Sequence, residues 1–310
     1  MAEKTEYNEQ SSRANMNVWS MKLATWIGLS SILIWASLVA VVKLITESTS
    51  PVQGIALIYT FSSLAILALI GFPKIMQMSK RYLLGCGALF VAYEILFLVA
   101  VAWSDHREQV MLIAMINYLW PPLMIVFSIF ARQLQARLWV IPGFLLAVVG
   151  LMLVVNPEIT NLSKLMQVLA ENPWAYGFAF IGALLWPCYC ILTRKYGRGQ
   201  NGVPIFFVVA VIALWGLHLG LDEPFRMPSL KLWLEIAIVG SLIGIAYSNW
   251  NQSMQYGNIK VLILATYFMP ILSSVMSMLI LDIRPELSFW IGTALVTAGA
   301  IVCWKSTQTT

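Results

Sequence analysis

Long apolar runs alternate with short polar segments along the whole chain. A membrane-spanning helix needs about 20 mostly apolar residues, and ten runs meet this length closely: 23–46, 51–72, 82–103, 109–131, 138–155, 174–193, 203–221, 230–252, 259–281 and 287–304. The longest connection, 156–173, leaves no room for a soluble catalytic domain. The pattern therefore predicts an all-α integral membrane protein with ten transmembrane helices.

The ten runs fall into two related halves. A shift of 149 residues aligns NYLWPPLMIVFSIF, which starts at Asn117, with TYFMPILSSVMSML, which starts at Thr266, and a shift of 151 aligns Trp35 with Trp186. Because five spans is an odd number, the second half runs in the opposite direction, as in the inverted repeats that enclose the central cavity of many secondary transporters. We predict two five-helix repeats at 23–155 and 174–304, a linker at 156–173 and tails at 1–22 and 305–310.

Composition and charge agree with this architecture. Hydrophobic residues make up 60% of the 310 residues and charged residues 11%, against roughly 45–50% and 25% in soluble domains. Of the 19 Lys and Arg residues, 13 fall on one side of the predicted membrane. The other six are Lys43, Arg107, Lys164, Arg226, Lys231 and Arg284. The positive-inside rule then places both tails in the cytoplasm and the linker outside it.

The sequence carries little that resembles enzyme chemistry. All four cysteines lie inside apolar runs, and neither a metal-ligand spacing nor a hydrolase motif is present. The cationic residues are scattered, which excludes a nucleic-acid partner. We therefore expect no catalytic residue, cofactor or metal. The expected partners are membrane lipid and a small-molecule solute, and we expect the protein to function as a monomer.

Glu94 is the deepest ionisable residue, in the middle of the third span. A charge at this depth costs at least about 2.5–3.5 kcal/mol unless it is paired. The carboxyl is interpreted as the partner of a substrate ammonium or as a proton carrier. The alternative is a neutral, hydrogen-bonded carboxyl that fixes helix packing.

Aromatic and amide side chains recur at mid-span depth. Asn117, Tyr118 and Trp120 precede Pro121-Pro122, which is expected to kink the fourth span. Further candidates for substrate binding are Tyr93, Trp186, Tyr189, Tyr247 and Asn251. Each alone is more typical of packing, but together with the deep Trp35, Trp120, Trp186 and Trp250 they favour a wide cavity for a planar, partly apolar solute. Amides and phenols, without an Arg or Lys pair at this depth, suit a zwitterion better than a phosphorylated substrate.

Several segments resemble a known family. VAYEILFLVAVAWS, MINYLWPPLMIVFSIF, AFIGALLWPCYCILTRKYGRGQNGVPIF and AYSNWNQSMQYGNIKVLILATYFMPILSS are similar to aromatic amino acid exporters of the drug/metabolite transporter superfamily, which carry an EamA-type repeat in each half. Tyr93, Glu94, Asn117, Tyr118, Trp120, Trp186 and Tyr189 fall on matching positions of that pattern. Pro187 departs from it, at a position where a small residue is expected.

The resemblance implies a function. It points to a secondary transporter that exports Trp, Phe and Tyr from the cytoplasm across the bacterial inner membrane, and we expect alternating access. The alternatives are export of other amino acids, metabolites or aromatic cationic drugs. A membrane scaffold or sensor without a transport cycle is a further alternative.

Overall fold

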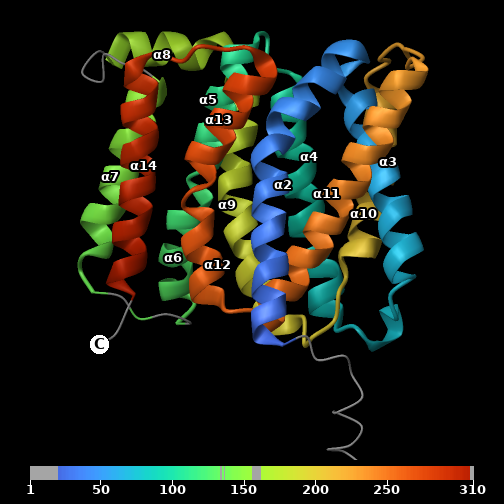
Figure 1. Ribbon diagram of the computed structural model, residues 1–310, viewed down its shortest axis with the longest axis horizontal. Coiled ribbons are helices and arrows are strands. Elements are labelled where there is room, and N and C mark those ends of the chain that lie inside the picture. Colours follow the sequence, from blue (N-terminus) through green and yellow to red (C-terminus); the bar gives the residue numbers. More distant parts are fainter. Residues whose placement is uncertain (1–19, 133–134, 136, 156–161, 308–310) are drawn as a thin grey trace, which may run out of the picture.

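Helices account for almost all of the computed structural model, which describes residues 20–132, 135, 137–155 and 162–307 (Figure 1). In chain order, the helices are α2 (Met21–Ser48), α3 (Pro51–Ile70), η1 (Ile75–Gln77), η2 (Arg81–Cys86), α4 (Gly87–Ala102), α5 (Arg107–Asn117), α6 (Trp120–Phe130), α7 (Val140–Val155), α8 (Leu162–Glu171), α9 (Pro173–Tyr196), α10 (Val203–Gly220), α11 (Leu230–Tyr256), α12 (Ile259–Thr266), α13 (Met269–Leu281) and α14 (Leu287–Ser306).

The predicted spans are confirmed. Among the described residues, nine helical segments are long and apolar enough to cross a membrane, and the shorter apolar helix Val140–Val154 corresponds to the tenth predicted span. The boundaries differ by a few residues, since charged and aromatic residues at helix ends belong to the interface. The 156–173 connection also contains a helix that the hydropathy pattern did not predict, α8, which lies across the upper end of the bundle in Figure 1. Most of the two tails, and residues 156–161, lie outside the described residues.

Two of the spans are broken at equivalent places in the two halves. The helix that starts at Arg107 is interrupted between Asn117 and Trp120, and the one that starts at Ile259 is interrupted between Thr266 and Met269. Each interruption is followed by proline, at Pro121-Pro122 and at Pro270, which lacks an N–H group and clashes with the carbonyl four residues earlier. Such breaks are tolerated inside a membrane only where protein or a cavity covers the freed backbone groups.

The spans assemble into groups that each mix both halves. The first group comprises α2 and α3 from the first half with α10 and α11 from the second. The second group comprises α4, α5 and α6 from the first half with α9 from the second, while α7 pairs with α14 and α13 packs on α2. The start of α2 and the end of α14 lie at the same end of the bundle, the lower end in Figure 1.

Small residues allow the closest contacts between helices. A β-carbon on Gly299 of α14 would lie 2.5 Å from the backbone nitrogen of Ala147 and 2.5 Å from the Gly143 oxygen of α7. In the first group, a β-carbon on Gly240 of α11 would lie 2.5 Å from the Ile58 oxygen of α3. These backbone-to-backbone approaches are the membrane equivalent of a packed core, because lipid provides no hydrophobic force between helices.

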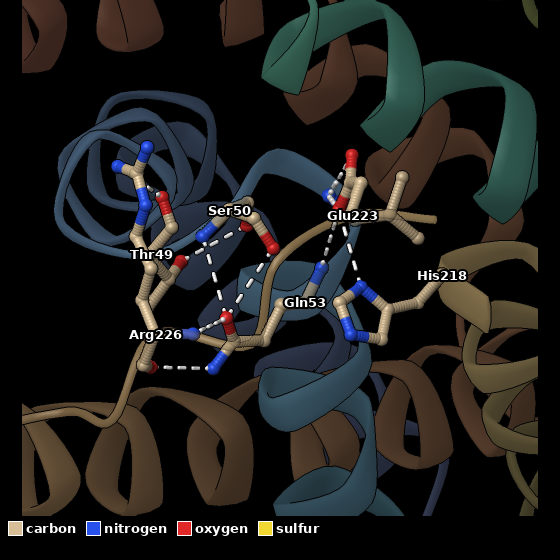
Figure 2. Close-up of polar contacts among 7 residues, drawn as sticks. Thr49, Ser50, Gln53, His218, Glu223 and Arg226 are labelled. Carbon is tan, nitrogen blue, oxygen red and sulfur yellow. Dashed lines mark hydrogen bonds and ion pairs between the residues drawn. The ribbon is translucent and has the colours of Figure 1, made fainter. Parts of the chain in front are cut away.

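A polar network ties the two halves together at the upper end (Figure 2). The Glu223 carboxylate, between α10 and α11, accepts hydrogen bonds from the backbone N–H of Val52 at 3.0 Å and of Gln53 at 3.4 Å, and His218 Nδ1 lies 3.2 Å from it. The Gln53 side chain donates to the Arg226 carbonyl at 2.7 Å and accepts from its N–H at 2.9 Å. The carboxylate thus satisfies N–H groups at the start of α3, where an anion also complements the helix dipole, and holds the first group together.

We expect Gly299→Ala to lower the melting temperature of the purified protein, because the added methyl group must push α7 and α14 apart, at a cost of about 1–3 kcal/mol. Thermal unfolding in detergent measures this. Gly216→Ala on α10 is the matched control, since no atom lies within 4 Å of its β-carbon position. Both substitutions change helix propensity alike, so equal melting temperatures would contradict the packing argument.

Candidate functional site

A small cavity lies between the two groups, at the level of the two broken spans. The side chains around it come from α2, α4, α9 and α11, from the first break with the helix ends beside it, and from the start of α13. They are Trp35, Leu38, Val39, Tyr93, Phe97, Asn117, Tyr118, Trp120, Trp186, Tyr247 and Met269. The cavity has a volume of ≈ 30 Å³, which holds about one or two water molecules. Among the described residues, no Lys, Arg, Asp or Glu lines it, so its wall offers aromatic faces and neutral polar groups.

Trp186 of α9 is the centre of the aromatic wall. Its ring lies 4.7 Å from Tyr93, 5.8 Å from Trp35 and 6.4 Å from Trp120, centroid to centroid. The Trp35 and Trp120 rings meet it edge to face, the arrangement that the ring quadrupole favours. A tryptophan held in this way by partners from three other helices is well ordered, and its indole forms a fixed surface for a planar ligand.

Two polar groups in the wall are incompletely satisfied. The Asn117 side chain makes two long hydrogen bonds to described residues, accepting from the Tyr93 hydroxyl at 3.4 Å and donating to the Ala179 carbonyl at 3.5 Å. The buried Trp35 Nε1 has no hydrogen-bond partner among the described residues. Buried donors are nearly always paired, so the indole N–H is available to a water molecule or a ligand acceptor.

The structure brings together six of the nine residues predicted to bind substrate: Tyr93, Asn117, Tyr118, Trp120, Trp186 and Tyr247. Glu94, Tyr189 and Asn251 lie outside the cavity lining. The sequence placed Trp35 deep in the bundle, but Trp35 was not predicted to bind substrate. Its alignment with Trp186, which was predicted to do so, could have identified it. The sequence offered no means of finding four further lining residues, because apolar side chains at this depth look the same as packing residues. They are Leu38, Val39, Phe97 and Met269.

Glu94 lies behind the cavity wall rather than in it. Its side chain is 1% exposed, and the Tyr59 hydroxyl of α3 donates a hydrogen bond to its Oε2. Tyr247 of α11 also faces this carboxyl. Since Glu94 belongs to the second group and both tyrosines to the first, the carboxyl connects the two groups at mid-membrane.

Below the cavity, a set of side chains closes the path to the lower end. Asn251 Oδ1 accepts from the Tyr82 hydroxyl at 3.3 Å and the Tyr189 hydroxyl at 3.2 Å, and Asn251 Nδ2 donates to Asn201 Oδ1 at 3.0 Å. The ring of Phe90 fills the space above them, 5.3 Å from the Tyr189 ring. We call Tyr82, Tyr189, Asn201 and Asn251 the lower closure. It joins α11 of the first group to η2 and α9.

Charged side chains close the upper end. Arg107 at the start of α5 forms a paired interaction with Glu47 of α2, with its Nε at 3.0 Å and its Nη2 at 2.6 Å from the carboxylate oxygens, and its Nη1 donates to the Leu281 carbonyl at 3.1 Å. Lys43 Nζ donates to the Ser104 carbonyl at 2.7 Å. We call Lys43, Glu47, Ser104 and Arg107 the upper closure. The upper closure thus joins α2 to the α4–α5 connection and to α5 on the other side of the cavity from the lower closure.

The helices around the cavity define the class of the protein. Within the described part of the chain, no three His, Cys, Asp or Glu residues gather in a way that could hold a metal ion. Ten spans, two broken helices that meet at mid-depth and a cavity between two helix groups define a class of protein, the secondary transporters with inverted repeats.

Comparison with known proteins specifies the family within that class. The sequence profile described as "EamA-like transporter family" matches residues 173–304, the second half. Over 286 residues, the chain is 34% identical to the aromatic amino acid exporter YddG of Salmonella typhimurium and to that of Escherichia coli K12, covering 92% of this chain and 98% of each relative. The Ancylobacter novellus exporter of the same name is 26% identical over 289 residues.

A solved crystal structure superimposes with a TM-score of 0.66 at 26% sequence identity, over 94% of this chain and all of the other. The chain belongs to the EamA-type transporter family, together with the YddG proteins, and it is not an enzyme. The family and the fold class predicted from the sequence are thereby confirmed.

We expect Asn251→Leu to loosen the lower closure, because three hydrogen bonds worth about 1 kcal/mol each are lost. Cys190 neighbours Tyr189 and is 2% exposed. In a variant that keeps only this cysteine, its alkylation rate should rise on the order of 100-fold, the change that corresponds to about 3 kcal/mol.

Asn249→Leu is the matched control, two positions earlier on α11 and therefore on another face of the helix. An alkylation rate for Asn251→Leu equal to that of the control would contradict the closing role of Asn251.

Proposed function

We propose that this protein exports aromatic amino acids from the bacterial cytoplasm across the inner membrane by alternating access. The observation that carries the proposal is the cavity formed by Trp35, Tyr93, Trp120, Trp186 and Asn117, which combines aromatic faces with neutral hydrogen-bonding groups. The relatives named as aromatic amino acid exporters support the same substrate class. The Lys and Arg distribution supports a cytoplasmic lower end, where α2 begins and α14 ends, and an extracytoplasmic upper end.

The side chains that line the cavity indicate how the substrate binds. The substrate ring stacks on the Trp186 indole, with Tyr93 and Trp120 at its sides, because offset and edge-to-face aromatic contacts are each worth about 0.5–1.5 kcal/mol beyond burial. The Trp35 N–H, which has no partner within the described chain, donates to the substrate carboxylate. Asn117 exchanges its long hydrogen bonds for shorter ones to the substrate ammonium or carboxylate. A cavity of ≈ 30 Å³ is too small for this ligand, so binding requires the two groups to separate.

The two closures then open in turn. Opening of the lower closure admits substrate from the cytoplasm, and rupture of the Glu47–Arg107 pair releases it on the other side. Each closure consists of a few hydrogen bonds and ion pairs, which contribute little individually, whereas packing within each group is continuous. Rigid-body movement of the groups is therefore favoured over rearrangement inside them.

Trp186→Ala and Trp120→Ala should each reduce tryptophan efflux from proteoliposomes at least tenfold. Each removes ring contacts that bind the substrate, and 1.4 kcal/mol corresponds to a factor of ten. Radiolabelled tryptophan measures the flux. Trp26→Ala is the matched control, since the Trp26 side chain is 70% exposed on the outside of α2.

Parental efflux in the Trp186→Ala, Trp120→Ala double variant would contradict the proposed site, and absence of tryptophan flux through the parent protein would favour a scaffold or sensor. Competition separates the substrate classes: phenylalanine and tyrosine should inhibit tryptophan flux, and an aromatic quaternary ammonium compound should not. Inhibition by the quaternary ammonium compound alone would favour export of aromatic cations through cation–π contacts.

We further propose that Glu94 carries a proton during the transport cycle. It is buried, it connects the two groups, and its neighbours Tyr59, Tyr93 and Tyr247 are the titratable groups that face it. Proton relays in transporters are commonly built on such intramembrane carboxyls.

Glu94→Gln should remove the response of efflux to an imposed pH gradient while the protein stays folded, because the amide oxygen still accepts the Tyr59 hydrogen bond. Efflux is measured with and without the gradient, and Glu235→Gln, at an exposed position near the start of α11, is the control. An unchanged pH response in Glu94→Gln would exclude this role and leave facilitated diffusion down the substrate gradient.

A further inference from the structure

An apolar groove of ≈ 620 Å³ opens on the outside of the bundle, between α4 and α10 in its lower half. Leu84, Ala88, Val91 and Ile95 of η2 and α4 form one side, and Ile205 and Val209 of α10 form the other. The groove follows α4 from Leu84 to Ile95, which is about 16 Å of helix. One leaflet contributes roughly half of a hydrocarbon core about 30 Å thick. The length of the groove along α4 therefore matches the thickness of one leaflet.

The groove breaks the symmetry between the two halves. α4 is the third span of the first half, and α10 is the second span of the second half. The corresponding pair, with the halves exchanged, is α11 and α3. There, Gly240 and Gly244 bring the helices into backbone contact, and the Ser62 hydroxyl donates to the Gly240 carbonyl at 2.6 Å. Between α4 and α10, aromatic rings lie at the crossing instead: Phe206 is 5.8 Å from Phe90, and its ring lies 2.9 Å from the β-carbon position of Gly87. The Phe206 ring lies between the two helices and lines the groove.

The segments next to the lower end of the groove carry cationic residues. Gln200 Nε2 donates to the Gln77 carbonyl at 2.9 Å, so the connection before η2 lies against the connection before α10. The Arg81 guanidinium lies 5.7 Å and the Lys195 ammonium 5.3 Å from the centre of the Tyr196 ring. Both side chains are exposed, and each lies against the Tyr196 ring.

No carboxylate from these segments balances the charge. Residues 71–93 contain Lys74, Lys80 and Arg81 but no Asp or Glu, and residues 172–221 contain Arg194, Lys195 and Arg198 but no Asp or Glu. An apolar channel one leaflet deep, with unbalanced cations at its polar end, is complementary to one kind of molecule, with acyl chains attached to a negatively charged headgroup.

We propose that the α4–α10 groove binds an anionic phospholipid of the leaflet at the lower end, with one acyl chain in the groove and the phosphate at Arg81 and Lys195. The bound lipid bridges the two helix groups, because α10 belongs to the first and α4 to the second. The site is separate from the central cavity and its binding does not depend on the transported solute.

Native mass spectrometry of the purified full chain, titrated with dioleoylphosphatidylglycerol or dioleoylphosphatidylcholine, tests the site. The parent protein should retain one phosphatidylglycerol at collision energies that remove phosphatidylcholine. Its melting temperature should rise by about 3–5 °C with phosphatidylglycerol and by less with phosphatidylcholine, as expected for a ligand that binds only the folded state.

The double variant Arg81→Gln, Lys195→Gln should lose this preference for phosphatidylglycerol. The variant Ala88→Trp, which fills the groove from an exposed position, should retain neither lipid. The matched controls are Lys22→Gln, Lys305→Gln, with the same change in charge at the same end, and Ile212→Trp, at a 68% exposed position of α10 outside the groove. Equal retention of the two lipids by the parent would overturn the proposal, and so would parental retention of phosphatidylglycerol by the Arg81→Gln, Lys195→Gln variant.

Discussion

The obligation to satisfy every backbone N–H and C=O group inside the membrane governs this structure. Lipid offers no hydrogen-bond partner, so each span must be a helix wherever it meets lipid. The chain departs from this rule at mid-depth in two places, between Asn117 and Trp120 and between Thr266 and Met269. Both departures follow from proline, and both lie inside the bundle. The breaks can exist only next to covered backbone or a cavity, and the cavity is found where they meet.

The inverted repeat determines how the bundle divides. Neither helix group is one half of the sequence, because each takes helices from both halves. Within the first group, Gly240 brings backbones into contact, and the Glu223 carboxylate and Gln53 add a polar tie at the upper end. Across the groups, the contacts are aromatic rings, a few hydrogen bonds and the Glu47–Arg107 pair. Strong packing within groups and separable contacts between them are what alternating access requires.

The symmetry between the halves is incomplete, and the positions that differ include a buried carboxyl and a helix contact. Tyr93 and Tyr247 each lie in the third span of their half, and both line the cavity. The residues that follow them differ: Glu94 is a buried carboxyl held by Tyr59, whereas Ser248 accepts a hydrogen bond from Asn201 at 2.6 Å. On the outside, glycine contacts close the α3–α11 pair while aromatic rings separate α4 from α10. The two halves therefore differ both in the mid-membrane carboxyl and in how closely these helix pairs pack.

Hydropathy and internal repetition by themselves determined the ten spans, the inverted halves and the two proline breaks, since these depend on local composition and on chain length against bilayer thickness. The family also followed from the sequence. Tertiary structure alone decided which deep polar residues share the cavity. Asn251 and Tyr189 have the same composition signal as Asn117 and Tyr118, yet they form the lower closure. Glu94 is one residue from Tyr93 but points to α3, because successive helical residues are about 100° apart and each faces whichever neighbour the packing supplies.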